Sequence, residues 1–415
     1  MRRKGIFYGW VVTGVLFITA FAGWGTTQGA FGVFVNPLAD DMGWSRTAVS
    51  AAFSINVAVG FTFGIMWGWL IDRWSGRGVL ALSGTLLGLG VFLGSTANTL
   101  WHFYLFYGFV AGTGLGGIFG PVSALLAKWF EGRSGLGLAL GLGTAGIHAG
   151  VAGMPVLSEY LISLNGWRLG FQTLSYIIWA ATLVAVVLAR SPDRDTRVSA
   201  GAAQADMLAP AAHPNPSGPD IPLPVALRTA PFWFIFAMLV AGFVLVMMVA
   251  VHLVPRAVDT GVTSATAATL LAAVGLLSMV GSIAGGVVVD RVGARRVYIG
   301  AMVIEMAAFI WLTFSSTLWM FYVFAAVFGV AHGAWAPQIG VIIARVFGTR
   351  HMGAIYGVVL IGAGIGAVIG PIMAGLFFDL TGTYSVAFVL VAIIAALAVA
   401  LGLLLPDRPI VPQRG

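Results

Sequence analysis

The chain has 415 residues, of which 59% are hydrophobic and only 8% are charged, and its formal net charge is +7. A water-soluble domain carries about 25% charged residues, so this composition excludes a soluble protein and indicates an integral membrane protein. The absence of cysteine excludes disulfides, thiolate metal sites and cysteine nucleophiles. The basic residues lie in short segments between apolar runs instead of one patch, which argues against a nucleic-acid partner.

Apolar runs separated by charged, proline or glycine residues predict an all-α membrane protein with twelve transmembrane helices. The runs are long enough to cross about 30 Å of hydrocarbon, whereas barrel strands would alternate over about ten residues. We expect an outer loop that holds Asn36-Pro37 and Gly43-Trp44-Ser45-Arg46, between the first and second helices. In chain order, the helices are expected near residues 8–34, 47–70, 78–97, 101–127, 135–160, 168–189, 231–254, 263–289, 296–316, 318–344, 352–378 and 383–405.

Residues 191–229 separate two halves of the chain. They hold seven of the 17 prolines and no apolar run, which is typical of a flexible aqueous linker. The end of this segment, Pro224 to Pro231, predicts a short helical approach to the seventh helix. The predicted organisation is therefore a six-helix bundle in residues 1–190, a cytoplasmic linker in residues 191–229, and a second six-helix bundle in residues 230–415.

The two halves repeat one another. Gly68-Trp-Leu-Ile-Asp72-Arg73 and Gly286-Val-Val-Val-Asp290-Arg291 each follow an apolar run, and the two Asp-Arg pairs are 218 residues apart. Helix breakers recur with almost the same shift, for example Pro155 with Pro371. Two similar bundles that rock about a midplane site are the architecture of alternating access, so the repeat predicts a transporter.

The distribution of lysine and arginine predicts the orientation of the chain. If the termini and the linker lie on one side, 18 of the 21 basic residues lie there as well. Only Arg46, Arg168 and Arg256 face the other side. By the positive-inside rule, both termini and the linker are expected in the cytoplasm.

The chain resembles the major facilitator superfamily in its two repeated loops, which are similar to the loops that this family carries between helices 2 and 3 and between helices 8 and 9. Further segments resemble the bacterial branch of monocarboxylate porters and oxalate:formate antiporters: Tyr8-Gly-Trp-Val-Val12, Phe31-Gly-Val-Phe34, Gly43-Trp-Ser-Arg46, Trp129-Phe130, Gly137-Leu-Ala-Leu-Gly141 and Ala145-Gly146. The resemblance covers nearly the whole chain. It implies a multi-pass transporter of the inner (cytoplasmic) membrane that needs no cofactor or metal, and we expect a monomer.

The resemblance also implies that the repeated loops act as a cytoplasmic gate. In this interpretation the loop residues make charge-assisted contacts with neighbouring helix ends and close the inner side. The alternative is that they are ordinary basic loops. The predicted gating residues are Asp72, Arg73, Asp290 and Arg291, with Lys128 and Arg345 as their partners or neighbours.

Glu305 is the acid that the sequence places at membrane depth, and a buried acid there is a candidate proton carrier. The alternative is a protonated or hydrogen-bonded structural role, because the ninth helix is peripheral in the fold that the resemblance implies. His148 and His332 are the potentially cationic side chains near mid-membrane, and His252 lies nearer the outer end of its helix. We expect His332 to contribute to proton coupling and either histidine to bind substrate, although each is also compatible with a core role.

Other polar and aromatic side chains are candidates for the transport cavity, because the resemblance implies that helices 1, 4, 7 and 10 line the pathway. Packing is the alternative for each of them. The predicted substrate-binding set, beyond the two histidines, is Gln28, Asn56, Trp335 and Gln338, with Thr26 and Thr27 beside them.

The sequence departs from its resembling branch in one respect. Relatives that carry anionic carboxylates place an arginine in helix 8, whereas Ser278 to Ile283 contains none, and the eleventh helix has no basic residue at membrane depth. The leading prediction is a secondary transporter of a small organic solute, a carboxylate, with proton symport or exchange. Proton-coupled efflux of a hydrophobic or amphipathic compound is the alternative, and a transporter-like sensor is a third possibility. The sequence shows no nucleophile-base pair, so we do not expect an enzyme.

Overall fold

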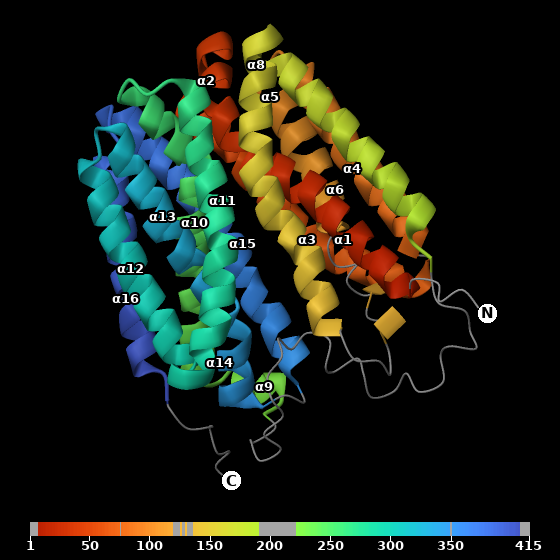
Figure 1. Ribbon diagram of the computed structural model, residues 1–415, viewed down its shortest axis with the longest axis vertical. Coiled ribbons are helices and arrows are strands. Elements are labelled where there is room, and N and C mark those ends of the chain that lie inside the picture. Colours follow the sequence, from red (N-terminus) through yellow and green to blue (C-terminus); the bar gives the residue numbers. More distant parts are fainter. Residues whose placement is uncertain are drawn as a thin grey trace, which may run out of the picture. The chain divides into compact units, whose positions relative to one another are not determined.

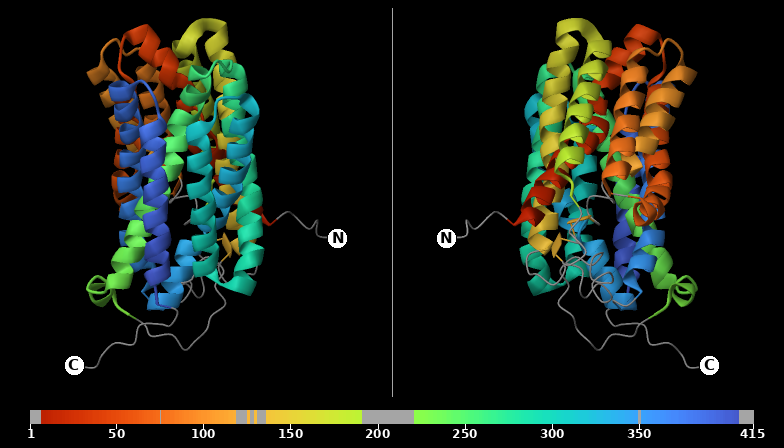
Figure 2. Two further views of the ribbon diagram at one scale, coloured as in Figure 1. Left: turned by 90° about the vertical axis from the view of Figure 1, so that its left-hand side faces the viewer. Right: turned by 90° about the vertical axis from the view of Figure 1, so that its right-hand side faces the viewer.

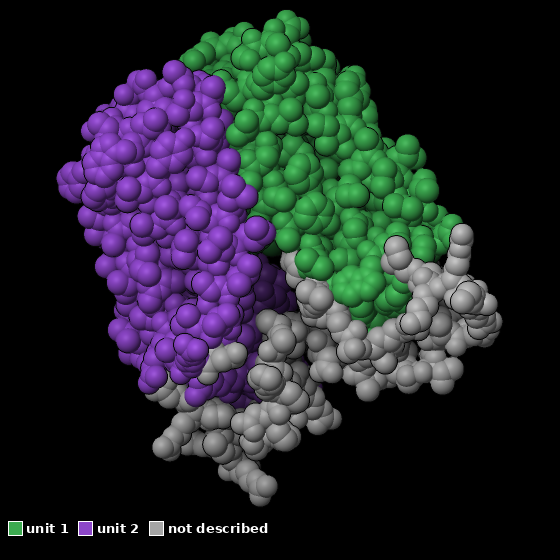
Figure 3. All heavy atoms as spheres, in the orientation of Figure 1, with its two compact units in different colours: residues 1–201 green, residues 202–415 purple. Residues whose placement is uncertain are grey.

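The computed structural model describes residues 7–74, 76–118, 125–126, 129–130, 136–190, 221–348 and 351–406, apart from a few side chains within helices, and the structural statements below concern these residues (Figure 1). They form helices and connecting turns, with no strand in the described ranges. Backbone contacts divide the chain into two compact units, residues 1–201 and 202–415 (Figure 3). Most of the predicted linker, residues 191–220, lies outside the described residues.

Unit 1 contains the first group of helices. The described elements are α1 (Tyr8–Trp24), the π-helix η1 (Gly25–Gly29), α2 (Phe31–Met42), α3 (Arg46–Arg73), α4 (Gly76–Ser95), α5 (Leu100–Phe103), the π-helix η2 (Tyr104–Ala111), α6 (Gly112–Gly116) and α8 (Leu136–Leu188). The expected outer loop began too early, because Asn36 and Pro37 lie inside α2. The turn comes at Gly43, within the second part of the predicted loop, and its φ of 65° favours glycine.

Unit 2 contains α9 (Leu223–Ala226), α10 (Ala230–Asp259), α11 (Ser264–Val292), α12 (Ala294–Phe314), α13 (Leu318–Trp335), α14 (Gln338–Phe347), α15 (Met352–Thr381) and α16 (Ser385–Leu404). Figure 2 shows these helices standing beside one another along a common direction. The short helix α9 confirms the predicted helical approach to the seventh helix. The seventh helix itself, α10, runs five residues beyond its predicted end at residue 254.

Ten helical stretches of the described chain are long and apolar enough to cross a membrane. One of them, Ala145–Leu188, has 44 residues and is interrupted at Asn165 and Gly166, where φ is −157° and 78°. This stretch therefore holds two crossings, as the predicted fifth and sixth helices require. The shorter run from α5 through α6 occupies the position of the predicted fourth helix.

The sequence repeat recurs at the helix boundaries. Gly43 and Gly261 both have positive φ, 65° and 91°. Two residues later, the side-chain oxygens of Ser45 and Thr263 each accept a hydrogen bond from a backbone N–H and cap the starts of α3 and α11. Equivalent residues thus fix the same turn in each unit.

Glycines bring helices of each unit into close contact. A Cβ atom on Gly146 would overlap the carbonyl oxygen of Phe17, and one on Gly366 would overlap that of Val240. The first pair joins α8 to α1, and the second joins α15 to α10. Small residues allow this approach in a membrane, where dispersion contacts replace the hydrophobic effect between helices.

Candidate functional site

A break in the predicted tenth helix forms the centre of the candidate site in unit 2. This helix is divided into α13, which ends at Trp335, and α14, which begins at Gln338. Pro337 lies between them and has no N–H to donate to the helix ladder. The Gln338 side chain donates from Nε2 to the carbonyl oxygen of Ala334 at 3.0 Å, while its Oε1 is buried without a hydrogen-bond partner among the described residues. Discontinuous helices of this kind surround the binding sites of many transporters.

Glu305 of α12 faces this break and is fully buried. Its Oε1 accepts a hydrogen bond from Nε1 of Trp335 at 3.0 Å, and Nδ1 of His332 lies 3.9 Å from the same oxygen. Its Oε2 is buried and has no hydrogen-bond partner in the described part of the chain. An ionised carboxylate in such a place is costly without a full set of donors. The arrangement therefore suits a carboxyl group that binds a proton.

Aromatic rings pack against one another around Glu305. His332 stacks on Phe328 with centroids 5.8 Å apart and lies edge-on to Trp335 at 5.6 Å. Tyr298, two helical turns before Glu305 on α12, contacts the indole edge-on at 5.8 Å. The sequence analysis did not identify Tyr298, although its spacing of seven residues from Glu305 places both on one helix face.

The structure brings together three residues that the sequence had assigned to different tasks. Glu305 was predicted for proton coupling, Trp335 for substrate binding, and His332 for both. They form one cluster, with Gln338 one turn beyond Trp335. Within the described residues, no group of three or more His, Cys, Asp or Glu side chains has a metal-binding arrangement.

The remaining substrate-binding candidates lie in unit 1. Asn56 is fully buried and donates from Nδ2 to the carbonyl oxygen of Tyr107 at 2.7 Å, inside the π-helical turn η2. This bond supplies a donor to a carbonyl oxygen at a point where the helical hydrogen-bond pattern is irregular. Gln28 is half-buried in the π-helix η1, and His148 is half-buried in α8. π-Helical turns often mark functional positions, so the place of Gln28 in η1 supports its prediction as a substrate-binding residue.

His252 makes a second polar cluster in unit 2. It is fully buried, with Nε2 2.9 Å from the carbonyl oxygen of Pro371 and Nδ1 3.2 Å from the hydroxyl of Tyr384. A carbonyl oxygen can only accept, so Nε2 carries the hydrogen and donates to it. This histidine therefore ties α10 to α15 and α16.

Most of the predicted gate lies outside the described side chains: those of Asp72, Arg73 and Asp290, and residue Lys128 altogether. Arg291 and Arg345 are described and exposed. The Nη1 atom of Arg345 lies 3.4 Å from the position that a Cβ would take on Gly293, so its guanidinium reaches the second loop.

The arginine that follows each loop has a defined contact. Arg77 donates to two carbonyl oxygens in the last turn of α8, those of Val186 and Val187, both at 2.8 Å. Arg295 donates to two carbonyl oxygens in the last turn of α16, of which that of Gly402 lies 2.8 Å from Nε. Both guanidinium groups donate to carbonyl oxygens at the C-terminal end of a helix. Their positive charge is favourable there, because this is the negative end of the helix dipole. The first turn of the helix that follows each loop is thus tied to the end of a neighbouring helix in the same unit.

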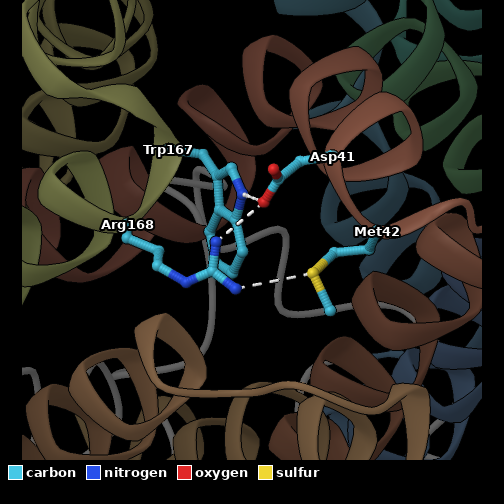
Figure 4. Close-up of polar contacts among 4 residues, drawn as sticks. All are labelled: Asp41, Met42, Trp167 and Arg168. Atoms are coloured by element: carbon cyan, nitrogen blue, oxygen red, sulfur yellow. Dashed lines mark hydrogen bonds and ion pairs between the residues drawn. The ribbon is translucent and has the colours of Figure 1, made fainter.

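In unit 1, Asp41 joins the last turn of α2 to the interruption of α8 (Figure 4). Its Oδ2 accepts hydrogen bonds from Nε1 of Trp167 at 2.8 Å and from Nη1 of Arg168 at 2.7 Å. The guanidinium also lies over the Trp167 ring, 4.3 Å from its centroid. The hydrogen bond from Trp167, followed by that from Arg168, lowers the pKa of Asp41 below its ordinary value of 3.8.

We expect Asp41→Asn to lower thermal stability slightly at pH 7 and by less at pH 3. A lowered pKa means that this contribution is present above the pKa of the unfolded chain and is lost as the pH falls through that of the folded chain. The effect should be that of a surface ion pair and should shrink at high salt. Thermal unfolding of both proteins in detergent at pH 7 and pH 3 measures it. A mutant that loses as much stability at pH 3 as at pH 7 would assign Asp41 to packing instead.

A sequence model of the Major Facilitator Superfamily matches residues 12–257 and 247–414 of this chain. The chain belongs to the Major Facilitator Superfamily. It is therefore a multi-pass membrane transporter with a small-molecule substrate, not an enzyme, and its twelve-helix fold is the one predicted.

Curated relatives of this transporter are monocarboxylate transporters. Monocarboxylate transporter 12 of Rattus norvegicus is 26% identical over 330 residues, which cover 75% of this chain and 68% of that protein. Monocarboxylate transporter 4 of Rattus norvegicus is 27% identical over 394 residues, covering 92% and 80%. Monocarboxylate transporter 13 of the same species is 28% identical over 389 residues, covering 92% and 85%.

Solved structures share the fold of this transporter. A bacterial homologue of the human lysosomal transporter Spinster, in an inward-facing and occupied conformation, superimposes with a TM-score of 0.72 at 14% identity and covers 95% of each chain. The nucleoside transporter NupG gives 0.72 at 13% identity, covering 94% of this chain and 98% of its own. At such identities the likeness concerns the fold alone.

Proposed function

We propose that this protein is a secondary active transporter that moves a small monocarboxylate together with a proton. The observation that carries the proposal is the buried carboxyl group of Glu305, which lies beside His332 at the break between α13 and α14. A proton bound there neutralises the carboxyl while the transporter changes conformation. The similarity to monocarboxylate transporters supports the substrate class.

The substrate needs a positive partner at membrane depth. The segment from Ser278 to Ile283 offers no arginine, so the proposed donors are His332 in unit 2 and His148 in unit 1. An imidazole that takes up a proton can hold a carboxylate, and its charge is lost again when the proton leaves. Gln28, Asn56 and Gln338 are the proposed neutral donors. Substrate and proton would thus depend on each other for binding.

The orientation follows from the basic residues, 18 of which lie on the side of the termini and linker. We place both termini and the linker in the cytoplasm, and the protein in the inner membrane as a monomer, with bundles in residues 1–190 and 230–415. The gate then closes the cytoplasmic side.

Uptake into liposomes tests the function. Purified protein would be reconstituted, and labelled lactate, pyruvate and other monocarboxylates would be offered at external pH 6 with internal pH 7.5. We expect accumulation that a protonophore abolishes and that protein-free liposomes lack. Apparent affinity should improve as the pH falls from about 7 to 6, because histidine has an unperturbed pKa of about 6.5.

Efflux of a hydrophobic compound remains the second candidate, because no fixed cation is present in the Ser278 to Ile283 segment. It would be favoured if no monocarboxylate were accumulated while a hydrophobic cation or dye left preloaded vesicles against its gradient. Binding of such a compound should vary little between pH 6 and 7.

We expect Asp72→Asn and Asp290→Asn to weaken the cytoplasmic gate and lower transport severalfold without preventing insertion. The loss of a charge-assisted contact at a helix end favours the inward-open population. The natural chain has no cysteine, so one cysteine introduced near the cytoplasmic end of a helix reports inner-side accessibility.

Asp40→Asn is a matched control for these two variants, since Asp40 is an exposed acid at the outer end of α2. It should change neither labelling nor transport. Equal labelling and equal initial rates in the wild type and in both gate variants would show that the loops do not form the gate.

A further inference from the structure

We infer that Trp335 is a positioning residue for the proton site: its indole N–H fixes the Glu305 carboxyl and links the protonation of Glu305 to the break between α13 and α14. The inference rests on the proposed function, in which Glu305 carries the proton. It gives Trp335 a task other than the substrate contact predicted from the sequence. The deciding contact is the hydrogen bond of 3.0 Å from Nε1 to Oε1, between two fully buried side chains.

The indole is held on several sides by the packing of unit 2. Gly242 of α10 leaves the space that the ring occupies, since a Cβ there would overlap its Cη2 and Cζ2 atoms. Tyr298 packs edge-on against the ring and donates its own hydroxyl to the carbonyl oxygen of Met238 at 2.9 Å. A ring fixed in this way cannot turn its N–H elsewhere without moving α10, α12 or α13.

This contact distinguishes the two oxygens of Glu305. Oε1 accepts from the indole, which is only a donor, so Oε1 must keep a lone pair in that direction. Oε2 has no hydrogen-bond partner among the described residues and is the oxygen free to carry the proton. His332 of α13 and Tyr298 of α12 are titratable groups that interact with the carboxyl.

The position of Trp335 in the chain supplies the link to conformation. It is the last residue of α13 and is followed directly by Ala336 and Pro337. Any change in the angle between α13 and α14 moves the backbone that carries the indole. Such a change would alter the hydrogen bond to Oε1 and therefore the affinity of Glu305 for its proton. Proton binding at Glu305 and the angle between α13 and α14 are therefore coupled through the side chain of Trp335.

The pH profile of uptake in Trp335→Phe tests the inference. This variant keeps an aromatic ring and loses the N–H that favours the ionised carboxylate. We expect the midpoint of the pH profile to move upwards by about one unit, a tenfold change in proton affinity, because hydrogen bonds to charged groups are the stronger ones. Trp335→His, which keeps a ring donor, should return the midpoint toward the wild type.

Two further variants keep the test decisive. Gly242→Ala retains the tryptophan but displaces its ring, and should shift the midpoint in the same direction. Trp311→Phe is the matched control, because the Trp311 indole donates to the carbonyl oxygen of Met320 at 3.0 Å and has no recorded contact with Glu305. It should leave the midpoint unchanged even if it lowers stability.

The outcomes separate the inference from the proposed function. If Glu305→Gln loses proton-driven uptake while Trp335→Phe and Gly242→Ala keep the wild-type midpoint, the positioning role is wrong and the proposed function stands. If Trp311→Phe shifts the midpoint as much as Trp335→Phe, the effect is general destabilisation and the inference is also wrong. If Glu305→Gln keeps wild-type proton-driven uptake, both fail.

Discussion

Glu305→Gln should lose accumulation driven by a pH gradient, by about tenfold or more, and should keep exchange of labelled for unlabelled substrate. Glutamine fills nearly the same volume and can still accept the hydrogen bond from Trp335 through its carbonyl oxygen. It cannot gain or lose a proton. A transporter with this change resembles one that is permanently protonated at this position, so the loaded protein can change conformation while net transport with a proton stops.

Counterflow and gradient-driven uptake in the same liposomes separate these two properties. Glu159→Gln is the matched control, because Glu159 is a half-buried acid of α8 in the other unit. This control should keep both activities. Wild-type accumulation in Glu305→Gln would assign the carboxyl group to structure, and loss of counterflow as well would mean that Glu305 is needed for substrate binding or folding.

The sequence predicts the helices of this transporter well, because charged residues, prolines and glycines interrupt its apolar runs at regular places. The predicted helix at 263–289 is observed as Ser264–Val292, and the one at 383–405 as Ser385–Leu404. The predicted loop between the first two helices began too early, at Asn36-Pro37. An Asn-Pro pair after an apolar run is typical of a turn, but the helix continues to Met42, where Gly43 supplies the positive φ that ends it.

The candidate site is less predictable, because it depends on how helices are rotated about their axes. Glu305 and Trp335 are 30 residues apart on different helices, and no pattern in the sequence relates their side chains. The sequence identified each as an unusual residue at membrane depth. Their hydrogen bond requires Gly242 on a third helix, since any larger residue would occupy the space of the indole. The π-helical turn at Gly25–Gly29 was likewise unpredicted, because a short Gly-Thr-Thr-Gln-Gly segment between apolar runs is also compatible with a regular helix.

Gly333→Ala is expected to destabilise the protein strongly, because the close approach of α13 to α11 leaves no room for a side chain. A Cβ on Gly333 would overlap the carbonyl oxygen of Ser278, and backbone cannot yield as a flexible side chain can. Overpacking of this kind costs about 1–3 kcal/mol or more. The equivalent position in unit 1 is Gly116, where a Cβ would overlap the carbonyl oxygen of Gly60, so Gly116→Ala should behave in the same way.

Gly300→Ala is the matched control for these two substitutions, because Gly300 lies inside α12 with nothing within 4 Å of the added carbon. Alanine there should be neutral or stabilising by up to about 1 kcal/mol, since it restricts the unfolded chain. The apparent melting temperature in detergent, followed by size-exclusion chromatography after heating, compares the three variants with the wild type. If Gly333→Ala has the same melting temperature as Gly300→Ala, the contact between α11 and α13 is looser than the structure shows. A large loss at Gly333 and Gly116 alone would mean that both units depend on the same glycine contact, which is the packing counterpart of the repeated loops.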